Sequence, residues 1–211
     1  MLDASAPGMV YYSSKFNLAI QETMMKKNKI VFTFNAPAVL CFAILSLAAL
    51  GLNTLTFGAS NRQFFSVYRA GFSPLSILRL FTHVLGHSSF SHYVSNMAFI
   101  LALGPIVEER YDSWRLLFMF AVTALATGLF HIFFGGGAML LGASSIVYML
   151  IFLASTSGSR PGEIPLTLVA VALLYLTQEI LGGLFTSSNI SHLSHIVGGI
   201  CGAVMGLFRH R

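Results

Sequence analysis

Charged side chains are scarce in this 211-residue sequence: 9% are Asp, Glu, Lys or Arg, 55% are hydrophobic, and the mean hydropathy is +0.77. A soluble domain has about 25% charged residues, so this chain lacks the polar side chains needed to cover a surface in water. The composition therefore predicts an integral membrane protein. The net charge of +5 comes from twelve basic and seven acidic residues, too sparse a set to indicate nucleic-acid binding.

Cysteine is equally rare. Cys41 and Cys201 are the only two, and both lie in apolar segments. This excludes a disulfide framework or a cysteine-based metal finger as the basis of the fold. The first thirty residues carry charges and contain no short apolar run before a small-residue cleavage site, so no cleavable signal peptide is expected.

Six apolar stretches come close to the roughly 20 residues that a spanning helix needs. An open sheet would leave backbone groups without partners in hydrocarbon. The predicted fold class is therefore an all-α membrane protein with six transmembrane helices in residues 36–211, preceded by a polar cytoplasmic tail in 1–35. The expected spans are 36–57, 90–107, 114–134, 138–154, 164–185 and 192–208.

Lysine and arginine predict the orientation of the spans. Six spans place both termini on one side, together with nine of the twelve basic residues; the other three, Arg62, Arg69 and Arg79, lie in the first loop, 58–89. We therefore expect cytoplasmic termini in a cell inner membrane, with the first loop on the outer face. Its mixture of aromatic residues and arginines favours an amphipathic element at the membrane interface.

Polar side chains within membrane spans are costly and mark functional sites by default. His92 and Asn96 lie on span 90–107, Ser144 and Ser145 on 138–154, and His195 on 192–208. All three spans run from outside to inside. At about 1.5 Å per residue, these groups lie roughly 15–22 Å from the inner ends of their spans. The sequence therefore predicts one polar layer in the outer half of the bilayer, opening toward the outer face.

This layer fits the chemistry of a serine nucleophile. His195 can accept the proton of the Ser144 hydroxyl, and His92 and Asn96, at positions i and i+4, can donate to an oxyanion. Glu179 is the only carboxylate at a comparable depth. It is not expected to reach the histidine, which favours a Ser–His dyad over a triad.

Small residues indicate that the helices around this layer approach closely. Gly198 and Gly202 belong to a small-xxx-small ladder on the last span, which lets helix backbones touch. Gly142 precedes Ser144, where a tight entry into the helix brings backbone amides near the hydroxyl. Tyr148 lies one turn from Ser144 on the same face and could pack against the histidine ring of the last span.

Four runs of sequence carry a family resemblance. They are His83-x3-His87-x4-His92-x3-Asn96-Met97, Gly104-Pro105 with Glu108-Glu109-Arg110, Gly142-Ala143-Ser144-Ser145, and Ser194-His195-x2-Gly198-x3-Gly202. In their order and placement they resemble the motifs of rhomboid intramembrane serine proteases, over about 36–211. The resemblance implies a six-helix bundle that hydrolyses peptide bonds in or beside the transmembrane segments of membrane-protein substrates in the lipid bilayer, with no metal or cofactor.

The resemblance also implies individual roles. Ser144 would be the nucleophile and His195 the general base. The oxyanion hole would consist of Asn96, His92 and the backbone N–H of Ser144. Tyr148 would stack on the imidazole of the general base.

Other positions match the family less closely. His83 and His87 would be structural or solvent-facing near the mouth of the cavity. Ser145 stands where the family usually has glycine, Leu78 where many members have tryptophan, and Ser194 where alanine is usual. These departures leave open a catalytically weak or inactive relative that binds transmembrane helices.

Two further alternatives remain from the residues alone. A zinc site could use His83, His87 and His92, although no carboxylate or cysteine completes the set. A small transporter or channel is disfavoured, because the sequence contains no internal repeat and no paired membrane charges. The sequence specifies neither the substrate nor the oligomeric state.

Overall fold

The computed structural model describes residues 33–71, 73–135, 137–156, 163–185 and 189–208, without the side chains of 176 and 178–191. The tail 1–32 lies outside these residues. Asn35–Arg211 forms one folded unit, and the regular secondary structure of its described residues is helical apart from an isolated bridge between Val67 and Leu140. The all-α class is confirmed.

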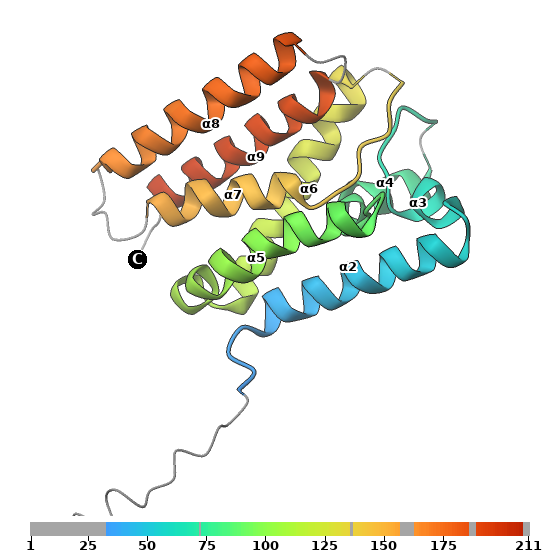
Figure 1. Cartoon of the computed structure of the whole chain (residues 1–211), viewed down its shortest axis with the longest axis horizontal. Helices are drawn as coiled ribbons and strands as arrows, with labels where there is room; N and C mark the ends of the chain where they lie inside the picture. Colours follow the sequence, from blue (N-terminus) through green and yellow to red (C-terminus); the bar gives the residue numbers. More distant parts are fainter. Residues whose placement is uncertain (1–32, 72, 136, 157–162, 186–188, 209–211) are drawn as a thin grey trace, which may run out of the picture. The chain divides into compact units, whose positions relative to one another are not determined.

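The elements are α2 (Pro37–Leu55), α3 (Ala59–Phe64), α4 (Pro74–Thr82), the 3₁₀ helix η1 (His83–Leu85), α5 (Phe90–Tyr111), α6 (Ser113–Phe134), α7 (Ser144–Ser155), α8 (Leu166–Phe185) and α9 (Asn189–Leu207) (Figure 1).

Among the described residues, three helices, α2, α5 and α6, are long and apolar enough to cross a membrane. Each of the six expected spans overlaps one helix, but within the described residues α7, α8 and α9 offer shorter apolar stretches. The expected fourth span is wrong at its start, because α7 begins at Ser144 and not at residue 138. The preceding residues are held away from helical geometry by the bridge at Leu140 and by a positive φ at Gly142.

The first turn of α2 is capped by a side chain from α5. Pro37 opens the helix, and the residue before it makes no side-chain cap. The buried carboxylate of Glu108 accepts the N–H of Ala38 at 2.8 Å through Oε1 and that of Val39 at 3.0 Å through Oε2. The Ser113 hydroxyl also donates to Oε1, at 2.6 Å. The negative charge lies at the positive end of the α2 dipole, so Glu108 joins the start of α2 to the end of α5.

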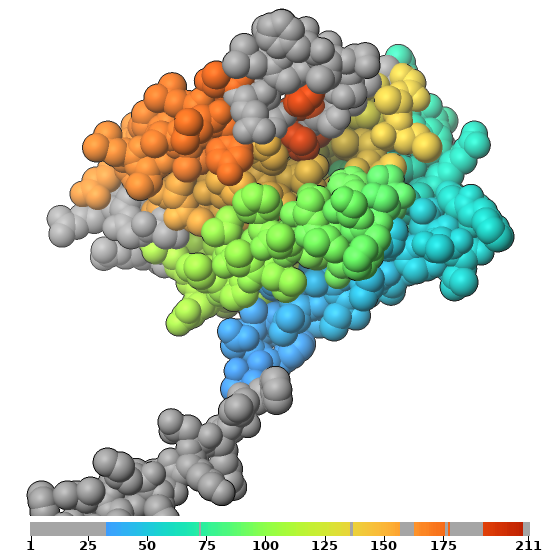
Figure 2. Space-filling view, in the orientation of Figure 1, coloured from blue at the N-terminus to red at the C-terminus, as the bar shows by residue number. Residues whose placement is uncertain are grey.

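α5 carries two of the expected site residues and has a defined start. The Oγ atom of Ser89 accepts the N–H of His92 at 3.1 Å, as an N-cap. At the other end, Asp112 adopts a φ of 65° and accepts the N–H of Arg115 at 3.0 Å. The chain therefore turns directly from α5 into α6, and Figure 2 shows α5 (green) packed along α2 (blue).

α7 lies inside the bundle, where it contacts α5, α6, α8 and α9 (Figure 1). α9 packs most closely against it. A Cβ atom at Gly198 or Gly202 would overlap the backbone carbonyl oxygens of Ser145 and Met149, so the glycines let the two backbones touch. The fully buried apolar side chains of α7 are Ile146, Met149, Leu150 and Leu153.

The first loop, between α2 and α5, is folded into α3, α4 and η1. The buried Arg79 donates from Nε to the carbonyl oxygen of Gln63 at 2.9 Å, and its guanidinium lies 4.6 Å from the centre of the Tyr68 ring. Ser73 caps α4 by accepting the N–H of Ser76 at 3.1 Å. These contacts make the loop a packed substructure, and its location at a membrane interface stays a prediction.

Candidate active site

Ser144 is the first residue of α7, and the segment before it is held at two points. Val67 and Leu140 exchange two backbone hydrogen bonds of 2.9 and 2.8 Å, and the N–H of Gly142 donates to the carbonyl of His83 at 2.9 Å. Gly142 has a φ of +122°, which L side chains rarely adopt. This path places Ser144 at a helix N-terminus, where backbone N–H groups have no partner within the helix.

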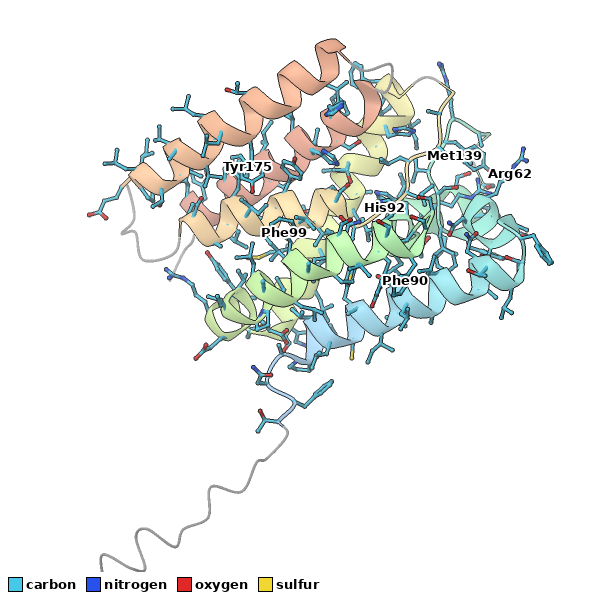
Figure 3. All side chains as sticks on the ribbon, in the orientation of Figure 1. Arg62, Phe90, His92, Phe99, Met139 and Tyr175 are labelled. Atoms are coloured by element: carbon cyan, nitrogen blue, oxygen red, sulfur yellow. The ribbon has the colours of Figure 1, made fainter. Side chains whose placement is uncertain are left out.

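His195 on α9 stacks on the ring of Tyr148 on α7, with centroids 4.5 Å apart and an interplanar angle of 7°. Tyr148 follows Ser144 by four residues, so the two side chains share one face of α7. The Tyr148 ring also meets Tyr175 of α8 edge to face at 5.5 Å (Figure 3). Aromatic and imidazole rings from three helices thus gather one turn from Ser144.

His92 and Asn96 on α5 approach the same place. Gly142 packs against both, because a Cβ atom there would lie 2.8 Å from His92 Nε2 and 3.9 Å from Asn96 Nδ2. The other imidazole nitrogen of His92, Nδ1, lies 3.2 Å from Ser88 Oγ (Figure 3). The imidazoles of His92 and His195 are close enough to interact electrostatically. Polar groups of α5, α7 and α9 therefore converge around the start of α7.

His83 and His87 were expected to be either structural or solvent-facing. Both are fully buried, so the solvent-facing alternative is wrong. Burial lowers the pKa of each to about 4, and both are therefore neutral at physiological pH. The Nδ1 atom of His83 lies 3.2 Å from the carbonyl oxygen of Arg79, and that of His87 lies 3.0 Å from the carbonyl oxygen of Leu85. Both histidines therefore belong to the packed interior between the first loop and the helices.

Sequence reasoning missed one contact at this site. The Nε2 atom of His87 lies 3.2 Å from Nδ2 of Asn96. His87 and Asn96 belong to one run of polar residues in the sequence, but His87 lies in the turn before α5, and helix periodicity does not predict which α5 side chain a turn residue contacts.

The adjacent serines have different environments. Ser145 is 3% exposed and its backbone faces Gly198, whereas Ser144 is half-buried. Ser144 is therefore the more accessible of the two. Leu78 is exposed on α4 and Ser194 is buried on α9. The positions at which this chain departs from the family pattern therefore differ in their exposure to solvent.

The sequence left open a zinc site at His83, His87 and His92 as an alternative, and it did not predict a carboxylate partner for His195. Among the residues that the structure describes, no three His, Cys, Asp or Glu side chains are placed to hold a metal ion. The side chain of Glu179 lies outside the described residues.

The described residues, with their apolar helices and the polar side chains gathered between α5, α7 and α9, are those of a helical membrane protein with a candidate site between its helices. The family model described as Rhomboid domain matches residues 74–211. This match covers more than half of the chain, and the chain belongs to the rhomboid family.

Curated relatives carry the name Rhomboid protease GlpG. The protein from Serratia proteamaculans is 28% identical over 177 residues, which is 82% of this chain and 61% of the relative. The one from Pectobacterium atrosepticum is 27% identical over 179 residues, 82% of this chain and 62% of the relative. The one from Salmonella choleraesuis is 29% identical over 131 residues, 61% of this chain and 47% of the relative. The matched part spans about three fifths or less of the length of these relatives.

Proposed function

We propose that this protein is an intramembrane serine endopeptidase that cleaves membrane-protein substrates in or next to their transmembrane segments. The observation that carries the proposal is the stacking of His195 on Tyr148, one turn from Ser144 at the N-terminus of α7. The name of the relatives, Rhomboid protease GlpG, agrees with this chemistry.

In the proposed mechanism, Ser144 Oγ attacks the carbonyl carbon of the scissile peptide bond while His195 takes the hydroxyl proton. Collapse of the tetrahedral intermediate breaks the C–N bond, and His195 gives that proton to the departing amine. A water molecule then attacks the acyl-enzyme ester and loses a proton to His195. Collapse of this second intermediate breaks the bond between the acyl carbon and Ser144 Oγ, His195 returns the proton to Oγ, and the acid product leaves. The stacked tyrosine ring restricts rotation of the imidazole, which favours one orientation for both proton transfers.

The negative oxygen of the tetrahedral intermediate needs donors that are in place before the reaction. The backbone N–H of Ser144 is available because it opens a helix. His92 can donate from Nε2 when the Ser88 hydroxyl donates to its Nδ1 atom. The Asn96 amide supplies a third N–H. Gly142 supports this role, since any side chain there would displace His92.

The membrane arrangement is part of the proposal. Residues 36–211 would form six spans, with 1–35 as a cytoplasmic tail and the site opening toward the outer face of a cell inner membrane. A scissile bond must leave its helical hydrogen bonds to reach Ser144. Substrate helices with small or helix-breaking residues are therefore the expected targets.

The test compares wild-type protein with Ser144→Ala and Ser145→Ala in liposomes that contain a single-pass substrate. Ser144→Ala should abolish cleavage and Ser145→Ala should retain it. A fluorophosphonate probe should label the wild-type protein in a reaction that depends on both Ser144 and His195. Cleavage that persists in Ser144→Ala overturns the assignment. Substrate binding without cleavage in the wild type supports instead an inactive relative that binds transmembrane helices.

A further inference from the structure

His87 lies in the turn between η1 and α5, and its proton can be placed from its contacts. Its Nδ1 atom is 3.0 Å from the carbonyl oxygen of Leu85. A carbonyl oxygen can only accept, so Nδ1 carries the hydrogen and Nε2 of the neutral ring is a bare acceptor. Burial lowers the pKa of His87 to about 4, which keeps this tautomer neutral over the physiological range.

The bare nitrogen determines how the Asn96 side chain is turned. Nε2 of His87 lies 3.2 Å from Nδ2 of Asn96. Only the NH2 end of the amide can satisfy a bare acceptor, so the carbonyl end must point away from His87. One N–H of Asn96 is used in this contact. The second remains for another acceptor, on an amide that already lies 3.9 Å from the Cβ position of Gly142.

The ring of His87 is itself held firmly. Its backbone carbonyl accepts from Nδ2 of Asn61 at 2.9 Å, and its side chain is fully buried. The ring meets those of His92 and Tyr93 edge to face, with centroids 5.1 and 5.5 Å away. The two side chains proposed as oxyanion donors, His92 and Asn96, therefore rest on the same fixed imidazole.

We infer that His87 is a positioning residue, whose bare Nε2 atom holds the Asn96 amide with its free N–H directed at the oxyanion. This inference rests on the proposed function and deepens it. His87 does not touch the substrate and acts through Asn96. If His87 served only to pack the interior, its contribution to the fold would be the same with and without the Asn96 amide.

The experiment uses two replacements of equal length. His87→Gln keeps an acceptor oxygen near the position of Nε2, whereas His87→Met keeps the chain length without a good acceptor. Deleting one oxyanion donor costs about 10²–10³ in kcat, so a misdirected donor should cost about tenfold. We expect kcat to fall about tenfold in His87→Met and less than about threefold in His87→Gln, with KM nearly unchanged, since only the transition state gains from the donor.

A double-variant cycle shows whether the effect passes through Asn96. In an Asn96→Ala background, His87→Met should cause no further fall in kcat. The cycle is repeated with His87→Leu, which also lacks an acceptor, so that the result does not depend on one variant folding. Each variant is first compared with the wild type by thermal unfolding in the same detergent.

The outcomes separate this inference from the proposed function. Three results would overturn the positioning role. They are equal losses of kcat in His87→Gln and His87→Met, an unchanged kcat in His87→Met, and losses of kcat that multiply in the double variant. The proposed function fails on a different result, namely cleavage that persists in Ser144→Ala. If Ser144→Ala is inactive and the His87 variants have equal kcat values, the protease assignment stands and only the positioning role of His87 is refuted.

Discussion

Replacing Gly198 by alanine is expected to disable the site by moving α9 away from α7. An alanine Cβ atom there would lie 3.0 Å from both the Cα and the carbonyl carbon of Ser145, and closer still to the carbonyl oxygen. Ordinary van der Waals contact with a Cβ atom begins at 3.4 Å. The added Cβ atom is fixed to the α9 backbone and the atoms that it meets are backbone of α7, so no rotamer change can relieve the overlap.

The size of the effect follows from that overlap. The helices must separate by roughly 0.5–1 Å, and overpacking of this kind costs about 1–3 kcal/mol. At about 2–4 °C per kcal/mol for a chain of this size, the unfolding midpoint should fall by several degrees. Because His195 precedes Gly198 by one turn, the same shift moves the imidazole away from Ser144. A misplacement of about 1 Å at a reacting group can lower the rate about 10²-fold.

The assay measures cleavage of a single-pass substrate in liposomes together with thermal unfolding in detergent. Gly51→Ala is the matched control, because Gly51 lies in the α2 helix and has no neighbour within 4 Å of its Cβ position. That change should leave cleavage intact and raise stability by about 0.5–1 kcal/mol. Wild-type cleavage by Gly198→Ala would show that the site does not depend on this backbone contact.

Three further predictions concern the groups that hold the bundle and the site. Glu108→Gln should cost about 2–4 kcal/mol because an amide N–H then faces a backbone donor, while the exposed Glu109→Gln should leave the unfolding midpoint unchanged. The free energy of unfolding should fall as the pH drops from about 6.5 to about 4, because the unfolded chain binds protons that the buried rings of His83 and His87 do not. Each histidine contributes a fall of up to about 1.4 kcal/mol per pH unit. A free energy of unfolding that does not change over this pH range contradicts this. Gly142→Ala should lower kcat at least tenfold through the unfavourable φ and the overlap with His92, and unchanged turnover counts against that contact.

The sequence was informative where hydropathy decides the structure. Long apolar runs predict helices, and each expected span overlaps one. The polar side chains within those runs were selected as candidate site residues because few such groups occur at membrane depth, and their roles stay predictions. In the structure, Gly142 packs beside His92 and Asn96, because a Cβ atom at this glycine would lie close to both side chains.

The sequence was less informative where tertiary contacts override local pattern. The apolar run from residue 138 predicts a helix, but Leu140 pairs with Val67 and α7 begins only at Ser144. Glu108 has the character of a surface residue at a helix end, and its burial under the first turn of α2 depends on how α2 and α5 pack. Periodicity and composition do not encode such long-range partners.

The hydrogen bonds that hold the segment before Ser144 affect the order of events during synthesis and folding of this protein. Both anchors, Val67 and the carbonyl of His83, belong to the first loop, which is synthesised well before α7. A chain whose helices had inserted, but whose loop had not yet docked, would lack the contacts that set the start of α7. Under the proposed chemistry, a newly made molecule would therefore stay inert toward neighbouring membrane proteins until its folding was complete.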